Sequence, residues 1–185
     1  MDTAHRQAIE KLRHVSVATV ATALFKRGLR YQVIQDVHPV QKDYPEQYNR
    51  PVRNMVGPAF TLRYMPARED RNQITEFQNP QHPQRQAVEQ CPEGYVLVMD
   101  SRKDARAASA GDILITRLMI RGAEGIVTDG GFRDSMVIAG LDLPSYHSRP
   151  SSPTNLTLHE AIDINVPVGC GDAPVFPNDI ILGDG

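Results

Sequence analysis

Apolar residues along the chain form short continuous runs and helix-spaced stripes, and this mixture predicts an α/β fold. The clearest strand covers residues 95–99, YVLVM, a near-continuous apolar run typical of a central strand covered on both faces. Residues 59–64 alternate between the two sides, which predicts a strand with one buried face. Strands are also predicted at residues 33–37 and 125–128, and an all-β final section is predicted from 143–147 through 162–168, 173–176 and 180–182.

Helical spacing marks the other regular elements. Residues 4–27 predict a helix whose second half is capped by Ser16 or Thr19 and which ends at Gly28. Shorter helices are predicted at residues 82–90, 112–121 and 133–139. The polar residues 38–54 predict an exposed loop, and the glycine-rich residues 169–172 predict a tight hairpin.

The composition narrows the class of protein. The chain has 185 residues, of which 41% are hydrophobic and 23% are charged, and this fits one globular domain spanning residues 1–185. A formal net charge of −2 gives no electrostatic reason for a nucleic-acid or membrane partner. The charged N-terminus lacks the apolar core of a signal peptide, so we expect a cytoplasmic protein with Cys91 and Cys170 as free thiols.

The candidate chemistry lies between Gly111 and Asp134. Asp112 stands at the predicted start of a helix, and the adjacent Arg133 and Asp134 follow a turn with the sequence DGG. A helix start and a strand-to-helix turn can place charged groups in one crevice. A 2-oxo acid needs a hard cation on its carbonyl and carboxylate oxygens and a guanidinium over the developing oxyanion. An adjacent arginine and aspartate can supply both.

The predicted helix start offers a second part of this site. The free backbone amides from Gly111 through Asp112 and Ile113 to Leu114 are suited to a substrate carboxylate. Asp112 would then face a metal-bound water that carries a proton. Both aspartates also fit a purely structural role as acids that favour the helix dipole, with Arg133 solvated. The residues by themselves leave these alternatives open.

Other catalytic motifs are missing from the sequence. The six histidines lack the HxH or HExxH spacing of a zinc site, so none is predicted. There is no GxSxG elbow and no glycine-rich nucleotide loop. The basic loop at residues 102–106 could contact an anion, although a solvated loop is the simpler interpretation.

The spacing from Asp112 to Arg133 and Asp134, within GDILIT and GAEGIVTDGGFRD, resembles the RraA-like family. The similarity runs from about Val15 to the end and includes MVGPAFTLRY, YVLVMD and APVFPNDIILGDG in family order. Members of that family include class II pyruvate aldolases acting on 4-hydroxy-4-methyl-2-oxoglutarate and 4-carboxy-4-hydroxy-2-oxoadipate, and also the regulator of ribonuclease E activity. The resemblance implies a β/β/α swivelling-type single domain with mixed sheets, assembled as a homotrimer or hexamer with active sites between subunits.

Carried over by position, the resemblance also implies roles for the candidate residues. Asp134 would ligate Mg²⁺ or Mn²⁺, and Arg133 would bind the keto oxygen and stabilise a pyruvate enolate. Asp112 would hold metal-bound water, and the backbone of residues 111–114 would hold the substrate. The implied enzyme is a class II, metal-dependent aldolase, a carbon–carbon lyase. It would cleave a 4-hydroxy-2-oxo acid or diacid to pyruvate, with oxaloacetate decarboxylation as a side activity.

The alternative is a non-catalytic regulator that binds and inhibits ribonuclease E. Such regulators lose the acid of the Arg-Asp pair, whereas this chain keeps Asp134, which favours the enzyme. Two features depart from the family pattern. Residues 100–104 are charged where the aldolases usually carry glycines, which leaves the natural substrate open. The family also continues past Gly185 with another strand and a helical part, so we expect a chain truncated at its C-terminus.

Overall fold

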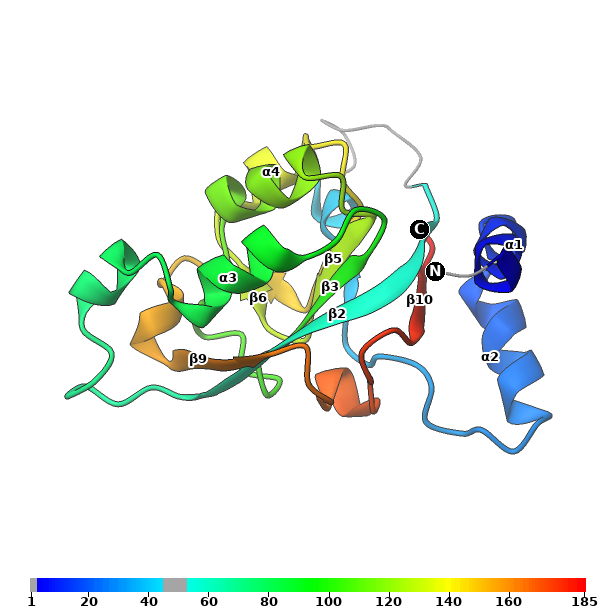
Figure 1. The fold of residues 1–185 in the computed structure, drawn as a ribbon, viewed down its shortest axis with the longest axis horizontal. Helices are drawn as coiled ribbons and strands as arrows, with labels where there is room; N and C mark the ends of the chain where they lie inside the picture. Colours follow the sequence, from blue (N-terminus) through cyan, green and yellow to red (C-terminus); the bar gives the residue numbers. More distant parts are fainter. Residues whose placement is uncertain (1–2, 45–52) are drawn as a thin grey trace.

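The centre of the fold is a parallel group of strands in a seven-stranded sheet. A computed structural model of the protein describes residues 3–44 and 53–185. Strand β2 (Met55–Pro66) pairs with β3 (Val96–Asp100), β3 pairs with β5 (Gly125–Thr128), and β5 pairs with β7 (Ser145–His147), all in parallel (Figure 1). The two predicted central strands are therefore neighbours in the same sheet.

Antiparallel strands close both edges of this sheet. Strand β1 (His38–Pro39) pairs with β7 at one edge. At the other edge β10 (Ile180–Gly183) pairs with the first part of β2, and β9 (His159–Ile164) pairs with its last part. One side of the long β2 thus pairs with β3, while its other side is divided between β10 and β9, and the sheet is mixed.

A second, smaller sheet extends from the ends of the parallel strands. It contains β4 (Ala108–Ala110), β6 (Gly131–Phe132) and β8 (Arg149–Pro150), paired in parallel in that order. Along the chain β4 follows β3, β6 follows β5, and β8 follows β7. Three of the four parallel strands of the large sheet are therefore each followed along the chain by one strand of the small sheet.

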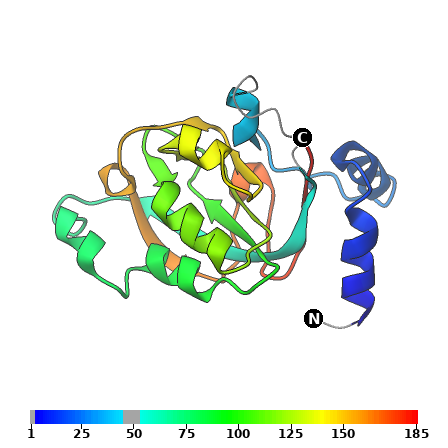
Figure 2. The ribbon, with the colours of Figure 1, turned by 90° about the horizontal axis from the view of Figure 1, so that it is seen from above.

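Three helices cover one face of the large sheet: α3 (Pro83–Gln90), α4 (Asp112–Ile120) and α5 (Ser135–Ala139) (Figures 1 and 2). Side chains from these helices and from the strands form the larger hydrophobic core, which includes Leu62, Leu97, Met99, Ile115, Leu118, Phe132 and Ile138. A smaller core on the opposite face contains Ala59, Val96, Val98, Val127 and Tyr146. Because neighbouring residues of a strand point to opposite faces, β3 contributes to both cores, as expected for a covered central strand.

Two N-terminal helices, α1 (Thr3–Leu12) and α2 (Val17–Phe25), stand apart from the helices over the sheet (Figure 2). The single helix predicted over residues 4–27 is therefore two. Ser16 caps α2 as expected, since its hydroxyl accepts a hydrogen bond from the Thr19 amide at 3.2 Å. Gly28 follows α2 with a left-handed φ of 85°, which agrees with the predicted end.

Several other local predictions differ from the structure. Residues 33–37 form no strand, because that segment turns at Asp36, which has a φ of 58°. The described part of the predicted loop 38–54 contains β1 and a 3₁₀ helix, η1 (Val40–Asp43), while residues 45–52 lie outside the described ranges. Strand β2 is buried on both faces from Met55 to Leu62, so the prediction of one buried face was wrong.

The final section is less regular than predicted. Strand β9 begins earlier than the predicted 162–168, and residues 173–176 contribute only a bridge from Val175 to Val168. That bridge encloses the short 3₁₀ helix η4 (Cys170–Asp172), consistent with a tight hairpin. The remaining 3₁₀ helices are η2 (Ile74–Gln78) and η3 (Asn155–Thr157). Both cysteines are free, as predicted, and both are buried. Within the described ranges, no helix has the length and apolarity needed to cross a membrane.

Candidate active site at the start of α4 and α5

The small parallel sheet brings the two parts of the predicted site together. Ala110, the last residue of β4, is the register partner of Phe132, the last residue of β6. Gly111 and Arg133 are the residues that follow these two strands. The Arg133 amide donates to the Ala110 carbonyl at 3.1 Å, which continues the pairing for one further residue. Helix α4 begins directly after Gly111, and α5 begins after Asp134. Two helix starts therefore lie side by side at the end of neighbouring parallel strands, an arrangement that favours ligand binding.

Asp134 has a left-handed backbone conformation, which is uncommon for residues other than glycine but is adopted by aspartate more readily than by most. It is the N-cap residue of α5, with left-handed dihedral angles of φ 56° and ψ 33°. Its carboxylate makes no capping hydrogen bond to the helix. Instead Arg133 donates from Nε to Oδ2 of Asp134 at 3.1 Å. The structure thus gives no support to a simple capping role for Asp134, and a left-handed non-glycine residue is a reason to examine a site for function.

Gly111 lies directly against this pair. A Cβ atom on Gly111 would stand 2.8 Å from Cγ of Arg133 and 3.0 Å from Oδ2 of Asp134. Its own backbone is extended, with a φ of −128°, so the absence of a side chain matters here for space and not for conformation. Gly111 therefore lets the start of α4 approach the two charged side chains.

A pocket of about 270 Å³ opens on the side of α5. Its lining contains the two charged residues, two aromatic residues, the start of α5 and a serine-containing segment: Tyr44, Phe132, Arg133, Asp134, Ser135, Met136, Val137, Pro150, Ser151 and Ser152. The side chains of Arg133 and Asp134 are 47% and 37% exposed, so both are open to a ligand. The pocket is consequently polar at its charged end and apolar along α5.

The predicted substrate-binding residues at the start of α4 do not all lie near the Arg133–Asp134 pair. Asp112, Ile113 and Leu114 do not line this pocket. Oδ1 of Asp112 accepts a hydrogen bond from the Ile113 amide at 2.8 Å, as a first-turn acid does, and the Ile113 side chain is 80% exposed. The structure brings Gly111 to the Arg133–Asp134 pair, while the half-buried Asp112 lies outside the pocket lining.

The glycine pair of the DGG turn packs against other segments of the protein. A Cβ on Gly130 would meet Oγ of Ser109 at 2.5 Å, and one on Gly131 would meet Cβ of Ser151 at 2.6 Å. Both glycines therefore make room for the protein's own serine side chains.

Asp129 is a structural residue that the sequence analysis did not single out. Its carboxylate is 2% exposed and accepts hydrogen bonds from the amides of Ser101 at 2.7 Å, Lys103 at 3.0 Å and Gly171 at 3.1 Å. Burial raises the pKa of this carboxyl, while the three amides act in the opposite direction. Asp129 ties two loops to the turn that precedes Arg133, and its only sequence signal is an acid directly after an apolar strand.

The charged loop at residues 100–106 is engaged in structural contacts. Nζ of Lys103 lies 2.6 Å from Oδ2 of Asp172 and 3.2 Å from Oδ2 of Asp36. Lys103 and the preceding Arg102 have left-handed φ values of 56° and 59°. Glycine would adopt this conformation without strain, and the charged residues hold it through their contacts with other segments.

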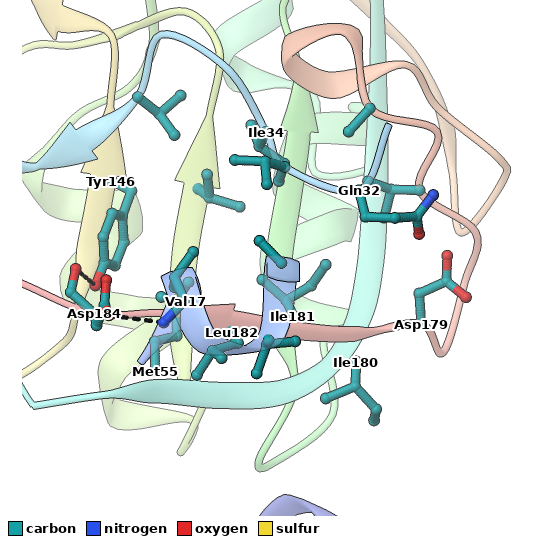
Figure 3. A pocket seen from close by; sticks show the side chains of 18 of the residues that line it. Val17, Gln32, Ile34, Met55, Tyr146, Asp179, Ile180, Ile181, Leu182 and Asp184 are labelled. Atoms are coloured by element: carbon teal, nitrogen blue, oxygen red, sulfur yellow. Dashed lines mark hydrogen bonds between the residues drawn. The ribbon is translucent and has the colours of Figure 1, made fainter. Parts of the chain in front are cut away.

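A larger cavity, of about 480 Å³, lies between α2 and the opposite face of the sheet (Figure 3). Its walls are mainly aliphatic, including Val17, Ile34, Met55, Ile181 and Leu182. Both acids of this lining make structural contacts. Oδ2 of Asp184 accepts from the Val17 amide at 2.8 Å, and Oδ2 of Asp179 accepts from the Phe176 amide at 2.8 Å. Size therefore does not identify the functional site, since the smaller pocket holds the reactive groups.

The donor set at Asp134 is compatible with Mg²⁺ or Mn²⁺. Mg²⁺ is usually held by one or two carboxylates, with water and substrate oxygens completing the shell. Within the described residues, the hydrogen bond of the Asp134 side chain is made through Oδ2, which leaves Oδ1 for a cation. A single carboxylate gives weak binding by itself, so substrate or further oxygen ligands would have to contribute.

Comparison with known proteins assigns this fold and segment order to a family. The profile of the RraA-like family, described as Aldolase/RraA, matches residues 17–185. A protein of Halalkalibacterium halodurans named "Putative 4-hydroxy-4-methyl-2-oxoglutarate aldolase" is 33% identical over 98 residues, or 53% of this chain and 46% of that protein. A protein of the same name from Ectopseudomonas mendocina is 36% identical over 92 residues, 50% of this chain and 56% of the relative. The chain spans about half the length of the curated relatives that it matches.

Solved structures show the same fold. Streptomyces coelicolor RraAS2, described as an unusual member of the RNase ES inhibitor RraA protein family, aligns with a TM-score of 0.80 at 24% identity. That alignment covers 100% of this chain and 82% of the other. The RNA-processing inhibitor RraA from Thermus thermophilis aligns with a TM-score of 0.55 at 19% identity, covering 82% and 79%. With the family profile matching all but the first residues, the chain belongs to the RraA-like (Aldolase/RraA) family.

Proposed function

We propose that this protein is a divalent-metal-dependent aldolase that cleaves a 4-hydroxy-2-oxo acid or diacid and releases pyruvate. The observation that carries the proposal is the Arg133–Asp134 pair, held at 3.1 Å in a pocket where Asp134 keeps a left-handed backbone without capping its helix. The names of the curated relatives support an aldolase-type activity. Family membership supports it further.

In this proposal Asp134 holds Mg²⁺ or Mn²⁺. When bound, the cation supplies Lewis-acid polarisation of the keto and carboxylate oxygens of the substrate. Arg133 donates hydrogen bonds to the 2-keto oxygen, where negative charge develops as the C3–C4 bond breaks. A guanidinium suits this task because it stays charged and presents several donors in one plane.

The remaining steps concern the proton and the carboxylate. The Ile113 amide in the first turn of α4 already donates to Oδ1 of Asp112 at 2.8 Å. The substrate carboxylate would therefore be held by the other backbone amides between Gly111 and Leu114, or by that amide once Asp112 releases it. Asp112 orients a water that takes the proton from the 4-hydroxyl, so that C4 becomes a carbonyl. The electron pair of the broken bond forms the enolate of pyruvate, which is then protonated at C3. Oxaloacetate decarboxylation passes through the same enolate and is proposed as a side activity.

Asp112 lies outside the pocket that contains Asp134. A site that includes both aspartates would therefore need additional residues from outside this pocket to enclose the substrate. Several large apolar side chains near both helix starts are exposed: Ile113 is 80% exposed, Met136 48% and Val137 51%. Exposed apolar residues beside a polar pocket are typical of a surface that another protein chain covers. We therefore include in the proposal an assembly into a homotrimer or hexamer, with active sites between subunits.

The test is a pyruvate-release assay coupled to NADH oxidation, over a panel of 4-hydroxy-2-oxo acids and oxaloacetate. Turnover is expected with Mg²⁺ or Mn²⁺ and not with excess chelator, and Asp134→Ala is expected to abolish it. Asp142→Ala, which removes an exposed carboxylate just beyond α5, is the matched control and should retain activity. Equal turnover with and without chelator would contradict the metal-dependent mechanism.

A regulatory function is the second candidate, because two proteins of the same fold are described as inhibitors of RNA processing or of an RNase. A binding experiment separates the two. A regulator would bind and inhibit ribonuclease E at micromolar concentration, and Asp134→Ala would leave that inhibition unchanged. Pyruvate release without such binding would support the aldolase alone.

A further inference from the structure

The structure brings two histidines and an aspartate together at the β1 edge of the large sheet. His38 in β1 and His147 in β7 are direct register partners, although 108 other residues separate them along the chain. Their rings lie 5.3 Å apart between centroids in an edge-on arrangement. Asp43, at the end of η1, turns back onto both rings. Three separate elements therefore supply the three side chains.

The donor atoms of these side chains converge on one point. Nε2 of His147 lies 2.7 Å from Oδ2 of Asp43, and Nε2 of His38 lies 2.9 Å from Oδ1 of Asp43. One ligand atom from each residue can be chosen so that all three lie within 4.8 Å of one another. Ligands on a tetrahedral zinc ion at about 2.0 Å stand about 3.3 Å apart, so small side-chain rotations are sufficient to close the site.

The environment also suits a metal ion with open positions. His147 is fully buried and stacks on Phe132, with ring centroids 5.6 Å apart and an interplanar angle of 29°, which fixes its orientation. The side chains of His38 and Asp43 are 29% and 25% exposed, so the cluster is reached from solvent on one side. Nδ1 of His147 has no hydrogen-bond partner among the described residues, so a hydrogen-bond network does not account for this ring completely.

We propose that His38, Asp43 and His147 bind a divalent transition-metal ion, with Zn²⁺ as the preferred ion and water in the remaining position. Two imidazoles and one carboxylate form a donor set that favours zinc, cobalt, nickel or iron over the all-oxygen shell preferred by Mg²⁺. The bound ion would clamp β1 and η1 to β7. The site is separate from the proposed Mg²⁺ ligand Asp134, although Phe132 of the pocket packs against His147.

The simpler interpretation is a metal-free cluster in which both imidazoles donate to the Asp43 carboxylate. The two interpretations differ in a direct measurement. Chelator-treated protein titrated with ZnCl₂ in a calorimeter should show one site with a dissociation constant below about 10 µM. His38→Gln and Asp43→Asn should each weaken it at least tenfold. These two residues are chosen because they are partly exposed, which makes the variants more tolerable than a change at the buried His147.

Two control variants locate the binding. His14→Gln makes the same chemical change at a histidine whose side chain is 79% exposed, and it should leave zinc affinity unchanged. Asp134→Asn should also leave it unchanged, so that failure of the aldolase proposal and failure of this one remain distinguishable. A zinc dissociation constant above about 10 µM for the wild type would overturn the proposal. Wild-type zinc affinity in both His38→Gln and Asp43→Asn would overturn it as well.

X-ray absorption on the zinc-loaded wild-type protein provides a readout that needs no variant. Two imidazole ligands with nitrogen or oxygen neighbours at about 2.0–2.1 Å are expected. A zinc–sulfur distance of about 2.3 Å would assign the ion to a cysteine and would also overturn the proposal.

Discussion

Gly111 and Asp134 follow different strands of the small sheet, yet a Cβ atom on Gly111 would lie 3.0 Å from the Asp134 carboxylate and 2.8 Å from Cγ of Arg133. Gly111→Ala should therefore displace the Arg133–Asp134 pair. Because an error of about 1 Å in a catalytic group can cost on the order of a hundredfold, we expect kcat to fall by about ten- to a hundredfold with the fold retained. The measurement is pyruvate release, with circular dichroism to monitor folding.

Gly169→Ala is the matched control for that substitution. No heavy atom outside the neighbouring residues lies within 4 Å of a Cβ at this position, and its φ is −114°. Its activity should equal that of the wild type. Full activity of Gly111→Ala would show that the close approach of α4 has no part in positioning the pair.

Arg133→Lys tests whether the positive charge of Arg133 is sufficient for activity or whether the planar guanidinium is also needed. Lysine keeps the positive charge but loses the planar guanidinium and the Nε donor that now contacts Asp134 at 3.1 Å. We expect kcat to fall by on the order of a hundredfold, the scale of losing one donor to a developing oxyanion. Arg149→Lys, on the neighbouring strand and outside the pocket lining, should keep its activity. Similar activity for Arg133→Lys and wild type would rule out bidentate recognition by this arginine.

Asp184 should hold α2 against the rest of the protein. The helix has no fully buried residue, and the carboxylate of Asp184 accepts from its first amide at 2.8 Å. Asp184→Ala removes this cap, and helix caps contribute about 1 kcal/mol. We expect faster hydrogen exchange in residues 17–25, measured by mass spectrometry, with little change in the central strands.

Asp70→Ala provides the comparison for that experiment. Asp70 forms an exposed pair with Arg68, and such pairs contribute little to stability. Exchange in residues 17–25 should stay at the wild-type rate in this variant. The same rate in Asp184→Ala would mean that the cap does not control the helix.

His159 should make the protein less stable in acid. Burial, followed by the nearby Arg102 guanidinium, lowers the pKa of His159, while Asp104 acts in the opposite direction. The unfolded chain, with a histidine pKa of about 6.5, then binds the proton more readily than the folded chain. The contribution of a neutral His159 to the free energy of unfolding is therefore fully present above about pH 6.5 and is lost as the pH falls below that value.

The contribution of His159 is measured with His159→Gln, in which an amide can still donate to the Asp104 carbonyl now held at 3.0 Å. The free energy of unfolding from urea titrations should be lower in the variant at pH 7.5. The difference from wild type should decrease toward pH 5, because the variant lacks this titrating group. His82 and His147 titrate in both proteins and cancel in the comparison. A constant difference across the range would exclude His159 as an acid-sensitive group.

The longer elements of the fold were predictable from the sequence because their signals are local. The apolar run that became β3, the helix at residues 112–121 that became α4 and the strand 125–128 that became β5 were confirmed almost residue for residue. The family was also recognisable from the spacing of Asp112, Arg133 and Asp134, and the family profile confirmed it. The catalytic, substrate-binding and metal-binding roles of these residues stay predictions, as do the extent of the domain and its location in the cell.

The tertiary structure alone decided which distant residues meet. Strands β4, β6 and β8 have only two or three residues each, too few to show any periodicity, and yet their register sets Gly111 against Arg133. The His38–His147 pair likewise depends on the register of β1 with β7, which no local spacing encodes. Residue pattern thus determined the long elements and the local Arg133–Asp134 pair. Strand pairing across the chain determined the shape of the site, because hydrogen bonds between short strands depend on what the rest of the fold places beside them.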